Sequence, residues 1–67
     1  MAGKERQEQL ISRMYSVKPG DIDTAVQLAG DMMAAKYWTR ETGEMLSQIV
    51  ARNEVELSEF NERIRTL

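Results

Sequence analysis

The chain has neither cysteine nor histidine among its 67 residues. No disulfide can form, and the thiolate and imidazole ligands that protein-bound zinc prefers are absent. The same absence removes the side chains that most often act as general base or thiol nucleophile in enzymes. The sequence therefore predicts a protein that is not an enzyme and that uses no metal, cofactor or small-molecule substrate.

Long apolar runs and a strong charge imbalance are also missing. No stretch of about 18 apolar residues is present, so no membrane-spanning helix is expected. Residues 1–6 are too polar for a secretory signal, which predicts a cytoplasmic protein. With 9 basic and 11 acidic residues the net charge is −2, without the basic excess that is typical of nucleic-acid binders.

Helix-breaking residues are few. The one proline, Pro19, precedes Gly20, and the four glycines are isolated along the chain. Between the breaks, apolar residues recur every three or four positions, as on one face of an α-helix, and no β-type alternation appears. The sequence predicts one all-α domain, residues 1–67, with three helices at about 4–17, 22–37 and 40–66. The two shorter helices should pack as a hairpin or bundle with the long C-terminal helix.

The predicted middle helix has the widest apolar surface. Its apolar residues cover an arc of roughly 200°, more than one neighbour needs, so we expect it to be the central helix. Asp21 or Asp23 can cap its first turn, because a side-chain oxygen there accepts a hydrogen bond from a free backbone N–H. Thr39 or Thr42 can cap the next helix in the same way.

Large side chains in the last third of the chain recur at alternating steps of four and three, which is the heptad pattern of a coiled coil. We call this set the heptad stripe; it consists of Leu46, Val50, Asn53, Leu57, Phe60, Ile64 and Leu67. A stripe of this kind can also be the core-facing side of a helix in a small bundle. A buried Asn53 would fix register and oligomeric state, whereas drift of the stripe around a straight helix would bring Asn53 to the surface.

Helix length favours an interface. A continuous helix over 40–66 would be some 40 Å long, and an antiparallel helix over 22–37 would cover only about 24 Å of it. The last three turns would then expose their large apolar side chains, and contiguous apolar patches usually mark interaction sites. The leading hypothesis is a small regulatory or interaction protein that forms a homodimer or larger homo-oligomer, or that docks on a protein partner, through the heptad stripe.

Trp38 is a further candidate for the interface. It lies outside the apolar arc of the preceding helix and is the only tryptophan in the chain. Exposed tryptophans commonly anchor interfaces. The alternative is that Trp38 closes over the core at the turn between the second and third helices.

A second hypothesis is DNA binding by a helix-turn-helix at residues 39–48, with the rest of the last helix as a dimerisation arm. Arg40, Thr42, Ser47 and Gln48 would then lie near a groove of the duplex. Glu41 and Glu44 at the reading end would repel phosphate, so nucleic acid is the less favoured partner. Membrane-surface binding is disfavoured as well, because no helix has a face rich in lysine and arginine.

Overall fold

The computed structural model describes residues 2–67, with side chains from residue 4 onward. This part of the chain forms four α-helices and contains no strand. The helices are α1 (Ala2–Ser16), α2 (Ile22–Ala34), α3 (Arg40–Val50) and α4 (Glu54–Arg65). The all-α prediction is confirmed, but the prediction of three helices is wrong, because the segment expected to form one long helix over 40–66 forms two.

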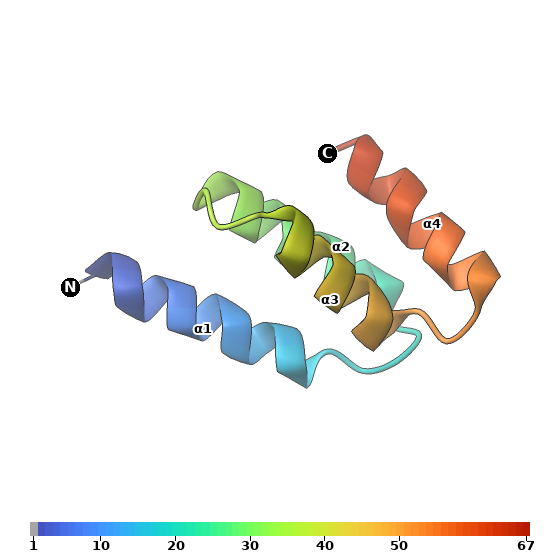
Figure 1. Cartoon of the computed structure of the whole chain (residues 1–67), viewed down its shortest axis with the longest axis horizontal. Helices are drawn as coiled ribbons and strands as arrows, with labels where there is room; N and C mark the ends of the chain where they lie inside the picture. Colours follow the sequence, from blue (N-terminus) through green and yellow to red (C-terminus); the bar gives the residue numbers. More distant parts are fainter. Residues whose placement is uncertain (1) are drawn as a thin grey trace.

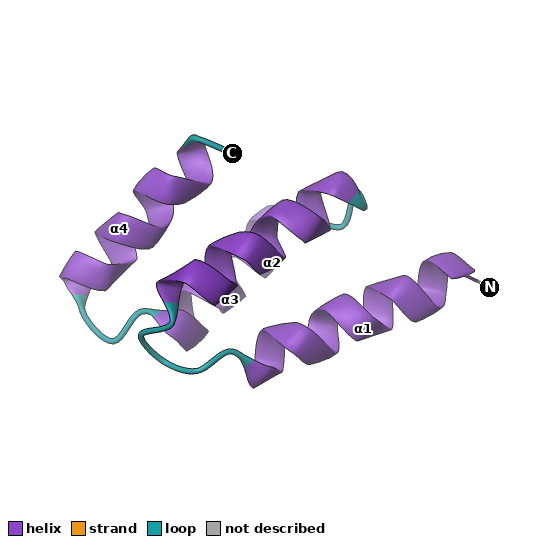
Figure 2. Ribbon diagram, turned by 180° about the vertical axis from the view of Figure 1, so that it is seen from behind, coloured by secondary structure: helices purple, strands orange, loops and turns teal. Residues whose placement is uncertain are grey.

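The four helices pack as a bundle around α2. Successive helices run in opposite directions, and α1 and α4 lie on opposite sides of the α2–α3 pair (Figures 1 and 2). Helices α2 and α3 each pack against the other three helices, whereas α1 and α4 do not pack against each other. The second helix thus has the central position expected for it, and it shares that position with α3.

The core is entirely apolar over the described residues. Half of its side chains come from α2, in agreement with the wide apolar arc of that helix. The buried set is Leu10, Met14, Val17, Ile22, Ala25, Val26, Leu28, Ala29, Met32, Leu46, Val50 and Phe60. Because every helix contributes to it, no single helix can bury its apolar face without the others.

The first turn of α2 is capped by Asp21, whose Oδ1 accepts a hydrogen bond from the Thr24 N–H at 3.4 Å. This decides between the two aspartates that the sequence offered. Asp23, the second residue of the helix, instead pairs with Arg63 of α4. An exposed ion pair of this kind contributes at most about 1 kcal/mol. The Asp23–Arg63 pair therefore helps to orient α4 on α2 and adds little to the stability of the fold.

Helix α2 ends at Ala34, three residues before the predicted end at residue 37. The Lys36 N–H donates to the Met33 carbonyl (3.0 Å) and the Tyr37 N–H to the Met32 carbonyl (2.8 Å). These two bonds form a Schellman motif, which requires a left-handed residue after the helix. That residue is Lys36, with φ of 63°. A lysine gives no sequence signal for this ending, because glycine is the usual residue there.

Replacing Lys36 with glycine should therefore stabilise the protein. A left-handed conformation costs a residue with a Cβ about 1–2 kcal/mol, and glycine adopts it freely. We expect the free energy of unfolding to rise by about 1 kcal/mol in urea denaturation. Lys36→Ala is the control, since it removes the amine but keeps the strain and should not stabilise. A Lys36→Gly variant less stable than the parent would contradict this interpretation of the turn.

Candidate interaction surface

The chain turns back on itself at residues 51–53, where one continuous helix was expected. Ala51 and Asn53 have extended backbone conformations, with ψ of 121° and 176°. The Asn53 side chain caps α4, because its Oδ1 accepts a hydrogen bond from the Glu56 N–H at 3.0 Å. Asparagine is among the residues that cap helices best. The sequence suggested that Asn53 is either a buried coiled-coil residue or a surface residue within a helix. It is neither, because it caps the beginning of a new helix.

Glu56 completes this cap. Its Oε1 accepts a hydrogen bond from the Arg52 backbone N–H at 2.8 Å, so the side chain reaches back across the turn to the residue before the N-cap, one residue farther than in a capping box. The same carboxylate binds the Arg52 guanidinium, with Nη2 2.6 Å from Oε2 and Nε 3.0 Å from Oε1. The Glu56 side chain is only 15% exposed. These hydrogen bonds hold the α3–α4 turn in one geometry.

The Arg52 contacts lower the pKa of Glu56 to about 2, chiefly through the side-chain hydrogen bonds and then through the backbone N–H. A carboxyl group whose pKa is lowered by folding stabilises the folded state above its unfolded pKa of about 4.5. That contribution is lost as the pH falls from about 4.5 to about 2. The Tm difference between the parent and Glu56→Gln should therefore be largest above pH 5 and should shrink toward pH 2. A difference that does not change with pH would contradict this role.

The turn is also tied to the loop between α1 and α2. The Gly20 N–H donates to the carbonyl of Val50, the last residue of α3, at 2.7 Å. Gly20 has φ of +90°, and the Arg52 guanidinium lies so close that a Cβ on Gly20 would be 2.6 Å from Arg52 Cζ. Two loops far apart in the sequence thus meet at one junction beside the start of α4.

Helix α4 folds back along α3 and leaves a groove between them, which we call the α3–α4 groove. It consists of two adjoining hollows that share Glu44, Ser47 and Leu57. The hollow at the Trp38 end has a volume of about 290 Å³, and the hollow at the turn end about 480 Å³. The first is also lined by Trp38, Thr39, Arg40, Gly43, Phe60, Asn61 and Ile64, and the second by Gln48, Ala51, Arg52, Asn53 and Glu54.

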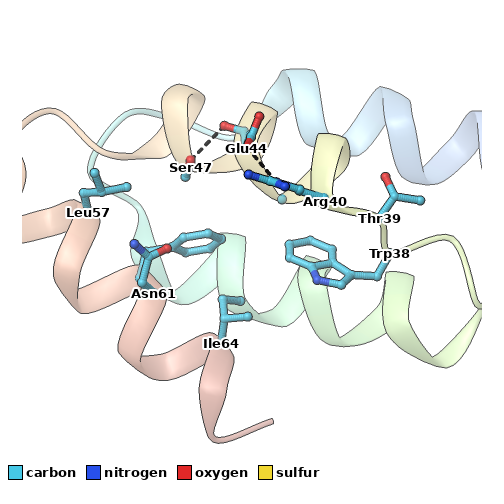
Figure 3. A pocket seen from close by; sticks show the side chains of 10 residues that line it. Trp38, Thr39, Arg40, Glu44, Ser47, Leu57, Asn61 and Ile64 are labelled. Carbon is cyan, nitrogen blue, oxygen red and sulfur yellow. Dashed lines mark hydrogen bonds and ion pairs between the residues drawn. The ribbon is translucent and has the colours of Figure 1, made fainter.

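Trp38 forms one end of the groove (Figure 3). It lies just before α3, whose N-cap Thr39 accepts a hydrogen bond from the Thr42 N–H at 3.1 Å. The indole packs over Gly43, since a Cβ there would be 3.0 Å from Trp38 Cζ2. Trp38 also borders the hydrophobic core, and it is half-buried. Trp38 therefore covers the core at the turn, and it also lines a groove that is open to solvent. Its role as an interface anchor stays a prediction.

The groove has an apolar base and a polar rim. Leu57 is 38% exposed, and Ile64 is half-buried against the core. On the α3 side, Glu44 Oε1 lies 3.4 Å from Arg40 Nε, and the Ser47 hydroxyl donates to the Glu44 carbonyl at 2.7 Å (Figure 3). An apolar strip bounded by polar groups is the usual construction of a protein-binding surface.

The residues predicted for the interface lie in different surroundings in the structure. Leu46, Val50 and Phe60 are buried in the core, where each is at most 1% exposed. Asn53 caps α4, and Leu67 lies beyond the end of α4, 57% exposed. The helix break thus disperses the heptad stripe, but it brings one subset together: Trp38, Leu57, Phe60 and Ile64 all line the same hollow.

Among the described residues, no group of three or more acidic side chains could hold a metal ion. None of the described helices combines the length and the apolar character that crossing a bilayer requires. The groove is also lined by Gly43, Glu44, Ser47 and Ala51. No sequence pattern groups these residues with Trp38, because the grouping depends on how α4 folds back.

Comparison of the chain with protein-family models, with curated proteins and with solved structures found no match.

Proposed function

We propose that this chain is a non-catalytic protein–protein interaction domain whose binding surface is the α3–α4 groove. The observation that carries the proposal is the exposed apolar strip between two helices: Leu57 is 38% exposed on the same hollow that Trp38 and Ile64 line. Burying a leucine side chain fully is worth about 1.5–3 kcal/mol, so a partner that covers this strip gains binding free energy there.

The shape of the groove favours a helical occupant. A groove between two antiparallel helices accepts the apolar face of a third helix, with anchor side chains spaced three or four residues apart. Trp38 at one end and Ala51 at the other, both lining the groove, mark its length. The occupant is then a helix from another protein or from a second copy of this chain.

A helical peptide tests this proposal directly. The probe is a 14-residue peptide with leucines along one face and glutamines elsewhere, so that it carries an apolar face without charge. Because Trp38 is the only tryptophan, its fluorescence reports on one end of the groove. We expect a saturable change in Trp38 fluorescence and amide shifts confined to groove residues. A dilution series of the protein alone, followed by sedimentation, tests the second copy as occupant.

Two aspartate substitutions on α4 provide a matched pair. Leu57→Asp places a charge in the groove, whereas Val55→Asp places the same charge two residues away, where Val55 is 78% exposed and lines neither hollow. We expect Leu57→Asp to abolish peptide binding or self-association and Val55→Asp to leave it unchanged, with both variants folded. If neither added peptide nor increasing protein concentration changes the Trp38 fluorescence or the amide shifts of groove residues in the parent, the proposal is wrong.

No feature of the described residues favours the DNA-binding alternative. Glu41 and Glu44 are exposed at the beginning of α3, the end that would read the duplex. Figure 1 shows α2 and α3 side by side in opposite directions, whereas helix-turn-helix motifs set their two helices at about 90–120°. Salt-dependent binding to duplex DNA would revive this alternative.

A further inference from the structure

We infer that the α3–α4 groove selects a partner helix that carries basic side chains beside its apolar face. The inference rests on the proposed function and adds the charge of the partner. It derives from the turn end of the groove, where three charged side chains surround an apolar base: Glu44, Arg52 and Glu54.

The positive charge of Arg52 is already compensated. Its guanidinium donates to both oxygens of Glu56, at distances of 2.6, 3.0 and 3.2 Å. Glu56 is only 15% exposed and lies outside both hollows. The Arg52 side chain is 61% exposed, but its guanidinium is hydrogen-bonded to the Glu56 carboxylate, so the pair carries no net charge. The two glutamates then determine the net charge of the side chains that line the hollow.

Glu44 is weakly held. Its only ion pair within the described chain is a single 3.4 Å contact with Arg40, and the two side chains are 63% and 91% exposed. An arginine that precedes its glutamate by four residues is in the less favourable order on a helix. Arg40 also stands at the positive end of the α3 dipole, where a cation is disfavoured. Glu44 can therefore exchange Arg40 for a cation of the partner at little cost.

Glu54 is exposed at the first position of α4 and makes no ion pair with any described residue. Glu44 and Glu54 thus flank the hollow from α3 and from α4. Between them lie Ala51 and the exposed part of Leu57. A lysine or arginine fits this arrangement, because its apolar stem can cover Ala51 and Leu57 while its charged end reaches a carboxylate.

The experiment compares three peptides that share the leucine face and differ only in the flanking residues, which are lysine, glutamine or glutamate. We expect the lysine peptide to bind about tenfold more tightly than the glutamine peptide at low salt, because two exposed charge contacts form; tenfold corresponds to about 1.4 kcal/mol. The glutamate peptide should bind most weakly. The advantage of the lysine peptide should shrink as salt increases.

A pair of double variants separates the groove from the net charge of the protein. Glu44→Gln/Glu54→Gln and Glu59→Gln/Glu62→Gln each remove two negative charges, but Glu59 and Glu62 line neither hollow. We expect only the first variant to lose the preference for lysine. Equal loss in both variants, or no preference in the parent, would overturn the inference.

Failure of the inference differs from failure of the proposed function. If the glutamine peptide binds in the groove and the lysine peptide binds no better, the groove is a docking surface without a preference for basic partners. If no peptide and no second copy occupies the groove, both are wrong. If the amide chemical shifts of groove residues change with protein concentration when no peptide is present, a second copy of the chain is the occupant. That result would overturn the inference of a basic partner.

Discussion

Phe60→Ala is expected to lower the free energy of unfolding by about 3–5 kcal/mol, the range measured for large aromatic residues truncated in protein cores. Phe60 is 1% exposed and lies in the core cluster. It is also the only buried side chain of α4. Its removal leaves α4 without its main attachment to the rest of the bundle.

A loss of this size approaches the whole stability that a domain of this length usually has. The variant should therefore be largely unfolded at 37 °C, with a collapsed urea midpoint and loss of helical circular dichroism. Val55→Ala on the same helix is the control, because a 78% exposed side chain should change stability by no more than about 0.5 kcal/mol. A folded Phe60→Ala protein of near-parent stability would show that α4 does not pack where the structure places it.

Gly20→Ala is the second large effect, with an expected loss of about 1–3 kcal/mol. Gly20 combines a φ of +90° with the close approach of Arg52, whose Cζ would lie 2.6 Å from an added Cβ. The alanine must therefore strain the loop and push Arg52 away. Strain in the loop should weaken the Gly20–Val50 hydrogen bond, and displacement of Arg52 should weaken the Arg52–Glu56 pair. Both contacts hold the α3–α4 turn.

Gly30→Ala is the matched control for this substitution. Gly30 lies within α2, and a Cβ there would meet no atom within 4 Å, so alanine should stabilise the helix by about 0.5–1 kcal/mol. Urea denaturation should thus give opposite signs for the two glycines. A double-mutant cycle with Arg52→Ala isolates the steric part, because the cost of Gly20→Ala should fall once Arg52 is removed. If Gly20→Ala lowers the free energy of unfolding equally with and without Arg52, the whole effect comes from the backbone angle φ of residue 20.

The sequence predicted the first half of the fold well. Apolar spacing placed α1 and α2 within a few residues of their observed bounds, and the wide apolar arc identified α2 as the central helix. The capping residues Asp21 and Thr39 were among the candidates. These features are local, so neighbouring residues determine them.

The α3–α4 break was missed although the sequence carries a signal for it. Asn53 followed by Glu56 has the spacing of a capping box, but the helical spacing of Leu46, Val50 and Leu57 on both sides made one continuous helix seem complete. The turn at residues 51–53 reverses the chain, yet the spacing of apolar residues along the sequence continues through it unchanged. Periodicity alone could not distinguish a long helix from two helices folded together.

The groove could be predicted only in part. Leu57 and Ile64 belong to the heptad stripe, Trp38 lies outside the apolar arc of the helix before it, and the structure places all three on one hollow. Phe60 belongs to the same stripe but is buried, because α4 folds back onto α2. The groove residues from α3, such as Glu44 and Ser47, depend on that reversal and have no signal of their own.

The central claim is that the chain reverses at residues 51–53 and so creates the groove, and NMR of the parent protein tests it most directly. Carbon chemical shifts and nuclear Overhauser effects would be measured together. The structure predicts that helical Cα shifts are interrupted at residues 51–53, and that the Phe60 ring shows contacts to side chains of α2. Continuous helical shifts from 44 to 66, without Phe60 contacts to α2, would restore the single long helix and contradict the groove.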